Sequence, residues 1–254
     1  MIIALDVGNT NIVFGIVKGD DVLFSARFAT DQRKTEDEYA VFFKEILDLH
    51  QIDHQKIKGG IISSVVPPLT RILARAVTLV SGVTPMIVGP GVKTGLNILI
   101  DQPRQLGSDM VVDAVAALSL YQPPLIILDL GTASTMSVID QKGNYIGSVI
   151  IPGIRISLDA LASRTAQLPR VSLEAPEHVI GRNTVTAMQS GLIYGQASLI
   201  DGMIDRIEHE LDMQTQIVAT GGLSKIIIPH CTHDIHYDQD LLIRGLLLIY
   251  RRNM

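Results

Sequence analysis

The feature that most constrains the fold is an internal duplication, in which one strand–turn–strand pattern occurs twice, half a chain apart. Ile3–Thr10 aligns without a gap with Ile126–Ala133, an offset of 123 residues (from Asp6 to Asp129) in a chain of 254. Each copy ends an apolar run with an aspartate and then a glycine, and continues with a second strand-like run, a polar turn and a third run. Three consecutive elements that agree in order and length predict two halves with one architecture.

The spacing of apolar residues between the two copies alternates between strand and helix. A strand-like run over Gly60–Ser64 lies between two stretches with helical spacing, the second of which covers Leu69–Val80. Alternating buried strands and helices predict an α/β fold. Another helical stretch, Val111–Leu120, lies near the middle of the chain, so we predict an N-terminal domain of residues 1–115 and a C-terminal domain of residues 116–254.

Composition excludes several classes of protein. The 21 basic and 26 acidic side chains are scattered and give a net charge of −5, so the clustered Lys and Arg of a nucleic-acid-binding surface are missing. The N-terminus shows no signal-peptide pattern, and no apolar run approaches the roughly 20 residues that span a bilayer, so we expect no membrane association. The single cysteine, Cys231, excludes a disulfide framework and indicates a reducing, cytoplasmic location.

The two Asp-x-Gly turns have a chemical use. One such turn alone is more often structural, but two in matched contexts favour phosphate binding. A hairpin tip of Gly-Asn-Thr or Gly-Thr-Ala brings backbone N–H groups close to phosphate oxygens, because glycine has no Cβ to block the approach. Asp6 and Asp129 are able to hold cations that screen the phosphates. A third strand ends in Gly221 and Gly222, where a nucleoside can lie against backbone, so we expect a polyphosphate to be bound from both sides.

Five segments, in order along the chain, resemble those of the type III pantothenate kinase family. They are Asp6-Val7-Gly8-Asn9-Thr10-Asn11, Gly107-Ser108-Asp109, Asp129-Leu130-Gly131-Thr132-Ala133, Ile151-Pro152-Gly153 and Ala219-Thr220-Gly221-Gly222. Thr165–Pro169 and Gly181–Thr184 are similar to further family segments, so the resemblance covers essentially the whole chain. The short length also fits, because larger sugar kinases and chaperones carry insertions for which this chain has no room.

The resemblance implies both a fold and an activity. The fold is the duplicated actin-like (ribonuclease H-like) two-domain α/β fold of sugar kinases, actin and heat-shock ATPases, with a nucleotide cleft between the halves. The implied activity is phosphoryl transfer from ATP to pantothenate, which gives 4′-phosphopantothenate in the first step of coenzyme A biosynthesis. The implied cofactors are Mg²⁺ with ATP and a monovalent cation, K⁺ or NH₄⁺. Family members are homodimers in which the partner subunit completes the substrate pocket.

Carried over position by position, the resemblance also implies residue roles. Asp109 matches the catalytic base, although on sequence grounds alone aspartate before a helix is a common N-cap. Asp6 would help to place Mg²⁺, and Asp129 would bind the monovalent cation. The expected ATP-binding residues are Asp6, Val7, Gly8, Asn9, Thr10, Asn11, Ile12, Val13, Thr132, Gly221 and Gly222. The expected substrate-binding residues are Ile100, Gly107, Ser108, Asp109, Met110 and Thr184.

The chain departs from the family pattern at two positions near the expected acceptor. Met110 stands where the motif Gly-Ala-Asp-Arg has arginine, which removes a fixed cation, and Ile100 stands where tyrosine is common. Arg104 is a local candidate to replace the missing charge, although an exposed arginine after proline is more often solvated. Two alternatives therefore stay open, namely a catalytically weak regulatory protein on the same fold and a kinase for another small hydroxyl acceptor.

A local group of His230, Cys231, His233 and His236 has the side-chain chemistry of zinc ligands. Its order follows no standard ligand spacing, so a surface loop with incidental histidines is the favoured interpretation.

Overall fold

The computed structural model describes residues 1–254 and divides into two compact units. Unit 1 consists of residues 1–96, 101–119 and 240–254, and unit 2 consists of residues 97–100 and 120–239. This division differs from the predicted boundary after residue 115, because the C-terminal helix α7 (Leu241–Arg252) belongs to unit 1. Its apolar face is buried in a core that unit 1 supplies, and the amphipathic pattern of a helix does not reveal its partner.

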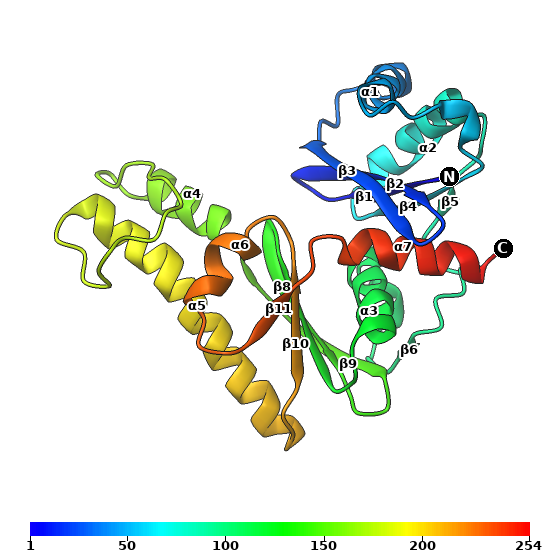
Figure 1. The fold of residues 1–254 in the computed structure, drawn as a ribbon. Coiled ribbons are helices and arrows are strands. Elements are labelled where there is room, and N and C mark those ends of the chain that lie inside the picture. Colours follow the sequence, from blue (N-terminus) through cyan, green and yellow to red (C-terminus); the bar gives the residue numbers. More distant parts are fainter. The chain divides into compact units, whose positions relative to one another are not determined.

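Unit 1 contains a five-stranded sheet with the order β3-β2-β1-β4-β5 (Figure 1). The strands are β1 (Ile2–Val7), β2 (Asn11–Lys18), β3 (Asp21–Ala29), β4 (Gly59–Ser64) and β5 (Met86–Ile87). The first three form an antiparallel meander, and β4 and β5 continue the sheet in parallel with β1. The carboxyl ends of β1 and β4 therefore lie at the same edge, with Asp6 in register with Ser63.

Helices cover both faces of this sheet. Ile3 and Leu5 of β1 point into a core that they share with α1 (Glu36–Leu49) and α2 (Pro67–Ser81). Ala4, on the opposite face of the same strand, packs with α3 (Ser108–Leu120) and α7. In Figure 1, α2 and α7 accordingly lie on opposite sides of the unit 1 sheet.

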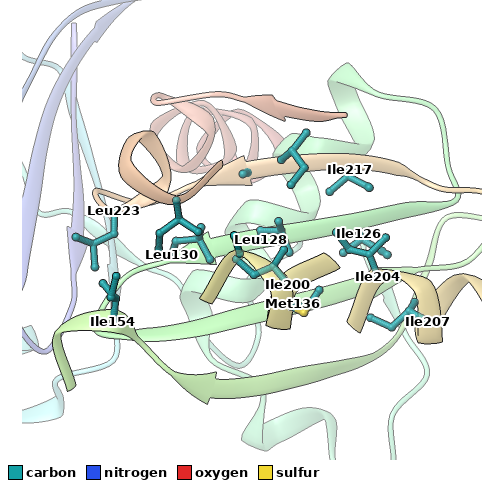
Figure 2. Close-up of a cluster of buried hydrophobic side chains, with 14 of the residues drawn as sticks. Ile126, Leu128, Leu130, Met136, Ile154, Ile200, Ile204, Ile207, Ile217 and Leu223 are labelled. Carbon is teal, nitrogen blue, oxygen red and sulfur yellow. The ribbon is translucent and has the colours of Figure 1, made fainter. Parts of the chain in front are cut away.

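Unit 2 contains a six-stranded sheet with the order β11-β10-β7-β8-β9-β6. The strands are β6 (Asn97–Ile98), β7 (Leu125–Leu130), β8 (Ala133–Ile139), β9 (Asn144–Pro152), β10 (Gln216–Thr220) and β11 (Ile235–Tyr237). Its helices are α4 (Ile154–Arg164), α5 (Thr184–Leu211) and α6 (Ser224–Ile227). Figure 2 shows Leu128 and Ile126 of β7 beside Ile200 and Ile204 of α5, with Leu130 nearer to Leu223, and all of them belong to the core of this unit.

The two sheets confirm the predicted duplication. The unit 1 order β3-β2-β1-β4-β5 is repeated in unit 2 as β9-β8-β7-β10-β11, and β6 adds one strand at the β9 edge. The two hairpins are not identical, because Val7 pairs with Ile12 in the first copy whereas Leu130 pairs with Ser134 in the second. The second turn is thus one residue shorter, so the ungapped alignment holds only as far as the turn.

Three short 3₁₀ helices complete the fold, namely η1 (His54–Lys56), η2 (Pro103–Gln105) and η3 (Ile228–His230). None of the helices has both the length and the apolar character needed to cross a membrane.

Candidate functional site

The first Asp-x-Gly turn connects β1 and β2 in unit 1. The N–H of Gly8 donates to the carbonyl of Asn11 (3.0 Å), which closes the turn. Asn9, Thr10 and Asn11 are exposed, whereas the side chains of Val7 and Ile12 are fully buried in the unit 1 core. Val7 and Ile12 are therefore able to contact a ligand only through their backbone atoms. The exposed tip, Asn9–Asn11, is therefore the part of this turn that a ligand is able to reach.

Asp109 lies in the first turn of α3, as its second residue. This corrects the alternative of an aspartate that caps the helix from outside, because the carbonyl of Gly107 accepts the first helical hydrogen bond, from the N–H of Val111 (3.2 Å). The Oδ1 atom of Asp109 instead accepts from the N–H of Met110 (2.8 Å). A Cβ on Gly107 would overlap this Oδ1 atom, so the glycine gives the carboxylate its room.

Ser108 anchors the start of α3 to the end of β4. Its Oγ lies 3.0 Å from Oγ of the fully buried Ser63, accepts from the N–H of Ser64 (3.1 Å) and lies 3.2 Å from the Ser64 carbonyl. Since Ser63 is in register with Asp6, these bonds bring the start of α3 to the edge of the sheet that carries Asp6. Ser63 and Ser64 were not predicted as site residues, and their only signal in the sequence is that two hydroxyl residues end a buried strand.

The electrostatics of Asp109 follow from its burial. Desolvation raises the pKa of its carboxyl above the usual aspartate range, and the hydrogen bond from the Met110 N–H opposes this in part. Met110 itself is 8% exposed, so the thioether that replaces the family's arginine is buried. A partly desolvated carboxylate with a raised pKa is a candidate general base.

Asp109→Asn is expected to change how stability depends on pH. Because the folded-state pKa of Asp109 is raised, the folded chain binds this proton more tightly than the unfolded chain does. The carboxyl therefore contributes stability below its unfolded pKa of about 4, and the contribution is lost as pH rises through the folded-state pKa. Asparagine cannot ionise, so the variant should gain stability relative to the parent when the pH is raised from about 4 to about 8.

Urea unfolding at the two pH values measures this change. Asp48→Asn, which alters an exposed carboxylate on α1, is the control and should show no such gain. An Asp109→Asn variant with the pH dependence of the parent would contradict the burial of this carboxylate.

The second Asp-x-Gly turn connects β7 and β8 in unit 2. The N–H of Gly131 donates to the carbonyl of Ala133, and the N–H of Gly153 donates to the carbonyl of Thr132, both at 3.2 Å. Gly153 begins α4, and a Cβ there would lie 2.5 Å from the Gly131 carbonyl oxygen. The turn that carries Thr132 therefore rests directly on a glycine.

Gly221 packs tightly against Asp129 and Leu130. It has a φ of +91°, and a Cβ would overlap Oδ1 of Asp129 and lie 2.7 Å from both the N and the O of Leu130. The carboxylate of Asp129 and the carbonyl of Leu130 are oxygen ligands of the kind that hard cations prefer, and the Leu130 carbonyl also accepts from the N–H of Leu223 (3.1 Å). The half-buried Asp129 thus fits a cation site. Gly222, the residue after Gly221, is exposed.

Thr184 is the first residue of α5 and lines a pocket of about 610 Å³ in unit 2. The remaining lining is mostly small or apolar and consists of Leu161, Leu168, Gly181, Arg182, Asn183, Ala187, Met188 and Gly191. Asn183 caps the helix by accepting from the N–H of Thr186 (2.9 Å). The expected substrate residue thus stands at an open, well-capped helix start.

Ile100 and Arg104 lie on the segment that leads from unit 2 to α3 of unit 1. Ile100 is half-buried and ends the short segment that unit 2 takes from the middle of the chain, whereas Gly107–Met110 belongs to unit 1. Arg104 lies exposed in η2, as expected of a solvated arginine.

The side chains of the histidine and cysteine group have separate partners. His233 lies between two carboxylates of α5, with Nδ1 3.1 Å from Asp201 and Nε2 3.2 Å from Asp205. His230 packs edge-on against the ring of Tyr194. Burial raises the pKa of the Cys231 thiol to about 12, which makes it a poor source of thiolate.

Comparisons with known proteins give one consistent family. A family model described as type III pantothenate kinase matches residues 2–206. A curated type III pantothenate kinase from an Exiguobacterium species is 46% identical over 253 residues, which cover 100% of this chain and 99% of the relative.

Solved structures with low sequence identity share the fold. A Campylobacter jejuni protein described as a Baf family transcriptional activator matches with a TM-score of 0.63 and 20% identity, over 99% of this chain and 98% of that chain. The activator of 2-hydroxyisocaproyl-CoA dehydratase from Clostridium difficile, solved with bound ADPNP, matches with a TM-score of 0.55 and 13% identity, over 98% and 92% of the two chains. At these identities the likeness concerns the fold alone.

Proposed function

Because this chain belongs to the type III pantothenate kinase family and phosphorylates pantothenate with ATP in coenzyme A biosynthesis, we propose that its two Asp-x-Gly hairpins bind the ATP phosphates and that Asp109 is the general base. The observation that carries the proposal is the set of hydrogen bonds from Ser108 to Ser63 and Ser64 in unit 1. These bonds hold the start of α3 at the sheet edge that carries Asp6, and Asp109 follows Ser108 in that helix. Phosphoryl transfer demands mainly positioning and charge compensation. The hairpins and Asp109 supply the positioning, and bound cations would supply the charge compensation.

The donor side of the reaction uses backbone groups and one carboxylate per unit. Residues Asp6–Val13 bind phosphates, and Thr132 with the Gly221–Gly222 turn contacts the nucleotide in unit 2. Mg²⁺ keeps several waters and takes one or two protein carboxylates besides the substrate phosphates, so the single Asp6 fits it. When bound with ATP, Mg²⁺ neutralises part of the charge on the phosphates. Asp129 and the Leu130 carbonyl hold a monovalent cation, K⁺ or NH₄⁺.

The acceptor side centres on Asp109. Its carboxylate takes the proton from the pantothenate hydroxyl, and the raised pKa makes it a stronger base than an ordinary aspartate. Gly107 leaves room for this carboxylate, and the buried Met110 offers an apolar wall where the family has arginine. Thr184 and Ile100 complete the substrate contacts. The location we propose is the cytoplasm, where ATP is available.

A coupled assay of ATP consumption tests the function. We expect turnover that depends on pantothenate and Mg²⁺ and rises when K⁺ or NH₄⁺ replaces Na⁺. ATP binding without pantothenate-dependent turnover would contradict the kinase function. A turnover rate that is the same in Na⁺, K⁺ and NH₄⁺ would contradict only the role of Asp129.

We also propose a homodimer, built on the exposed face of α5. Gly191, Gly195, Ser198 and Gly202 follow the spacing of one helix face, and a Cβ on Gly191 or Gly195 would meet open space. Apolar side chains are exposed on the same helix and just before it, namely Val179, Ile180, Val185 and Leu199. Since Gly191 also lines the pocket of Thr184, a second copy on this face would cover that pocket.

Gly195→Lys is expected to convert the dimer into monomers and to raise the KM for pantothenate. The open space at this position lets the monomer accept the side chain, and lysine is a better helix former than glycine by about 1 kcal/mol. Light scattering measures the mass, and thermal unfolding checks that the monomer stays folded. Glu210→Lys, on an exposed position of the same helix, is the control. A Gly195→Lys protein with unchanged mass would exclude this face as the interface.

A further inference from the structure

Thr30 makes two hydrogen bonds to the first Asp-x-Gly turn. Its N–H donates to the carbonyl of Thr10 (2.9 Å), which extends the β2–β3 ladder by one residue beyond the pair of Asn11 and Ala29. Its hydroxyl then adds a bond that no ladder provides, because Oγ1 donates to the carbonyl of Gly8 (2.6 Å). The half-buried Thr30 therefore donates hydrogen bonds to two carbonyl groups of the turn, those of Thr10 and Gly8.

The bond to the Gly8 carbonyl fixes the direction of the next N–H group. In a planar trans peptide the C=O and the N–H point in opposite directions. With the Gly8 carbonyl held toward Thr30, the N–H of Asn9 is directed away from Thr30, at the exposed tip of the turn. A flipped peptide would present a carbonyl oxygen there, and that oxygen would repel a phosphate.

The second copy of the hairpin provides an internal comparison. Gly153 follows β9 as Thr30 follows β3, and its N–H makes the same kind of bond, to the Thr132 carbonyl. Gly153 has no side chain, and a Cβ would collide with the carbonyls of the shorter second turn. The backbone bond is thus common to both copies, whereas the hydroxyl bond is specific to the first. A hairpin of this type does not need the hydroxyl to form.

We propose that Thr30 is a positioning residue for ATP, whose hydroxyl holds the Gly8–Asn9 peptide with its N–H directed at the phosphates. The proposal rests on the role of this turn in the proposed function. Thr30 does not contact the reacting atoms. Its hydrogen bond disfavours the flipped conformation of the Gly8–Asn9 peptide in the free enzyme. The expected effect therefore falls on nucleotide binding, and pantothenate binding is spared.

Thr30→Val and Thr30→Ser form a matched pair of variants, because valine keeps the shape and serine keeps the hydroxyl. Losing one hydrogen bond of this kind should raise the Kd and the KM for ATP about tenfold in Thr30→Val, with the KM for pantothenate unchanged. Thr30→Ser should restore the parent values. Calorimetric titration with ATP and steady-state kinetics give these numbers.

Thr78→Val is the control for loss of a hydroxyl bond elsewhere in unit 1, since Thr78 Oγ1 donates to the carbonyl of Ala74 (3.0 Å) in α2. It should lower the Tm without changing the KM for ATP. Equal ATP affinity in Thr30→Val and the parent would overturn the proposal, as would a failure of Thr30→Ser to restore it. If Thr30→Val does not fold, Thr30→Ala gives the same comparison.

Asp6→Asn separates this inference from the proposed function. If Asp6→Asn weakens ATP binding and Thr30→Val does not, the turn binds ATP and only the role of Thr30 is wrong. If neither variant changes ATP binding, the assignment of the turn itself is wrong, and the role of Thr30 is overturned with it.

Discussion

Replacing Asp109 by asparagine is expected to lower kcat by about 10²–10⁴-fold, the usual contribution of a positioned general base. Asparagine keeps the size of the side chain and can still accept from the Met110 N–H, so α3 should start unchanged. The lost function is acceptance of the hydroxyl proton. The KM for ATP should stay near the parent value, because Asp109 is not among the proposed nucleotide contacts.

The pH profile and a second variant make this test specific. In the parent, kcat/KM should rise with pH through a pKa above the usual aspartate range, and Asp109→Asn should lose that limb. Gly107→Ala keeps the Asp109 carboxylate but shifts its position, because the new Cβ would overlap Oδ1. It should also lower kcat, by less than Asp109→Asn. A kcat within a few-fold of the parent in Asp109→Asn would show that another group accepts the proton.

The family and the activity were predicted correctly from the resemblance of short motifs to a known family, and the duplicated α/β plan was predicted from local patterns. Asp6 and Asp129 end apolar runs that are long enough to be strands, and the glycines that follow mark the turns. The strand order was not predicted, because the repeat does not reveal that β1 pairs with β4 or that β7 pairs with β10.

What the sequence did not predict depends on contacts between distant segments. The apolar face of α7 is evident in Ile243 and Leu246. Nothing in the pattern shows that this face packs on the sheet of unit 1, which lies most of the chain away in sequence. The bonds from Ser108 to β4 and from Thr30 to Gly8 join residues 44 and 22 positions apart, and serine and threonine are too common to stand out as partners. The burial that raises the pKa of Asp109 is likewise a property of the folded unit.

Replacing Gly221 by alanine is expected to cost about 2–5 kcal/mol of stability and to impair both ATP binding and activation by the monovalent cation. Part of the cost is conformational, because φ at this position is +91° and L-residues pay about 1–2 kcal/mol there. The remainder comes from overlap of the new Cβ with Asp129 Oδ1 and the backbone of Leu130, at about 1–3 kcal/mol.

Gly82→Ala isolates the conformational part of this cost. Gly82 ends α2 with a φ of +71°, and a Cβ there would meet nothing within 4 Å. It should therefore lose about 1–2 kcal/mol of stability, with normal kinetics.

Urea unfolding gives the stabilities of the two variants, and the dependence of the rate on K⁺ and on ATP gives the functional effect. If Gly221→Ala folds too poorly to assay, Asp129→Asn removes the cation ligand without the overlap. The overlap displaces the carboxylate that we propose as a cation ligand. If Gly221→Ala had the stability and the K⁺ response of Gly82→Ala, the close packing of Gly221 against Asp129 would be contradicted.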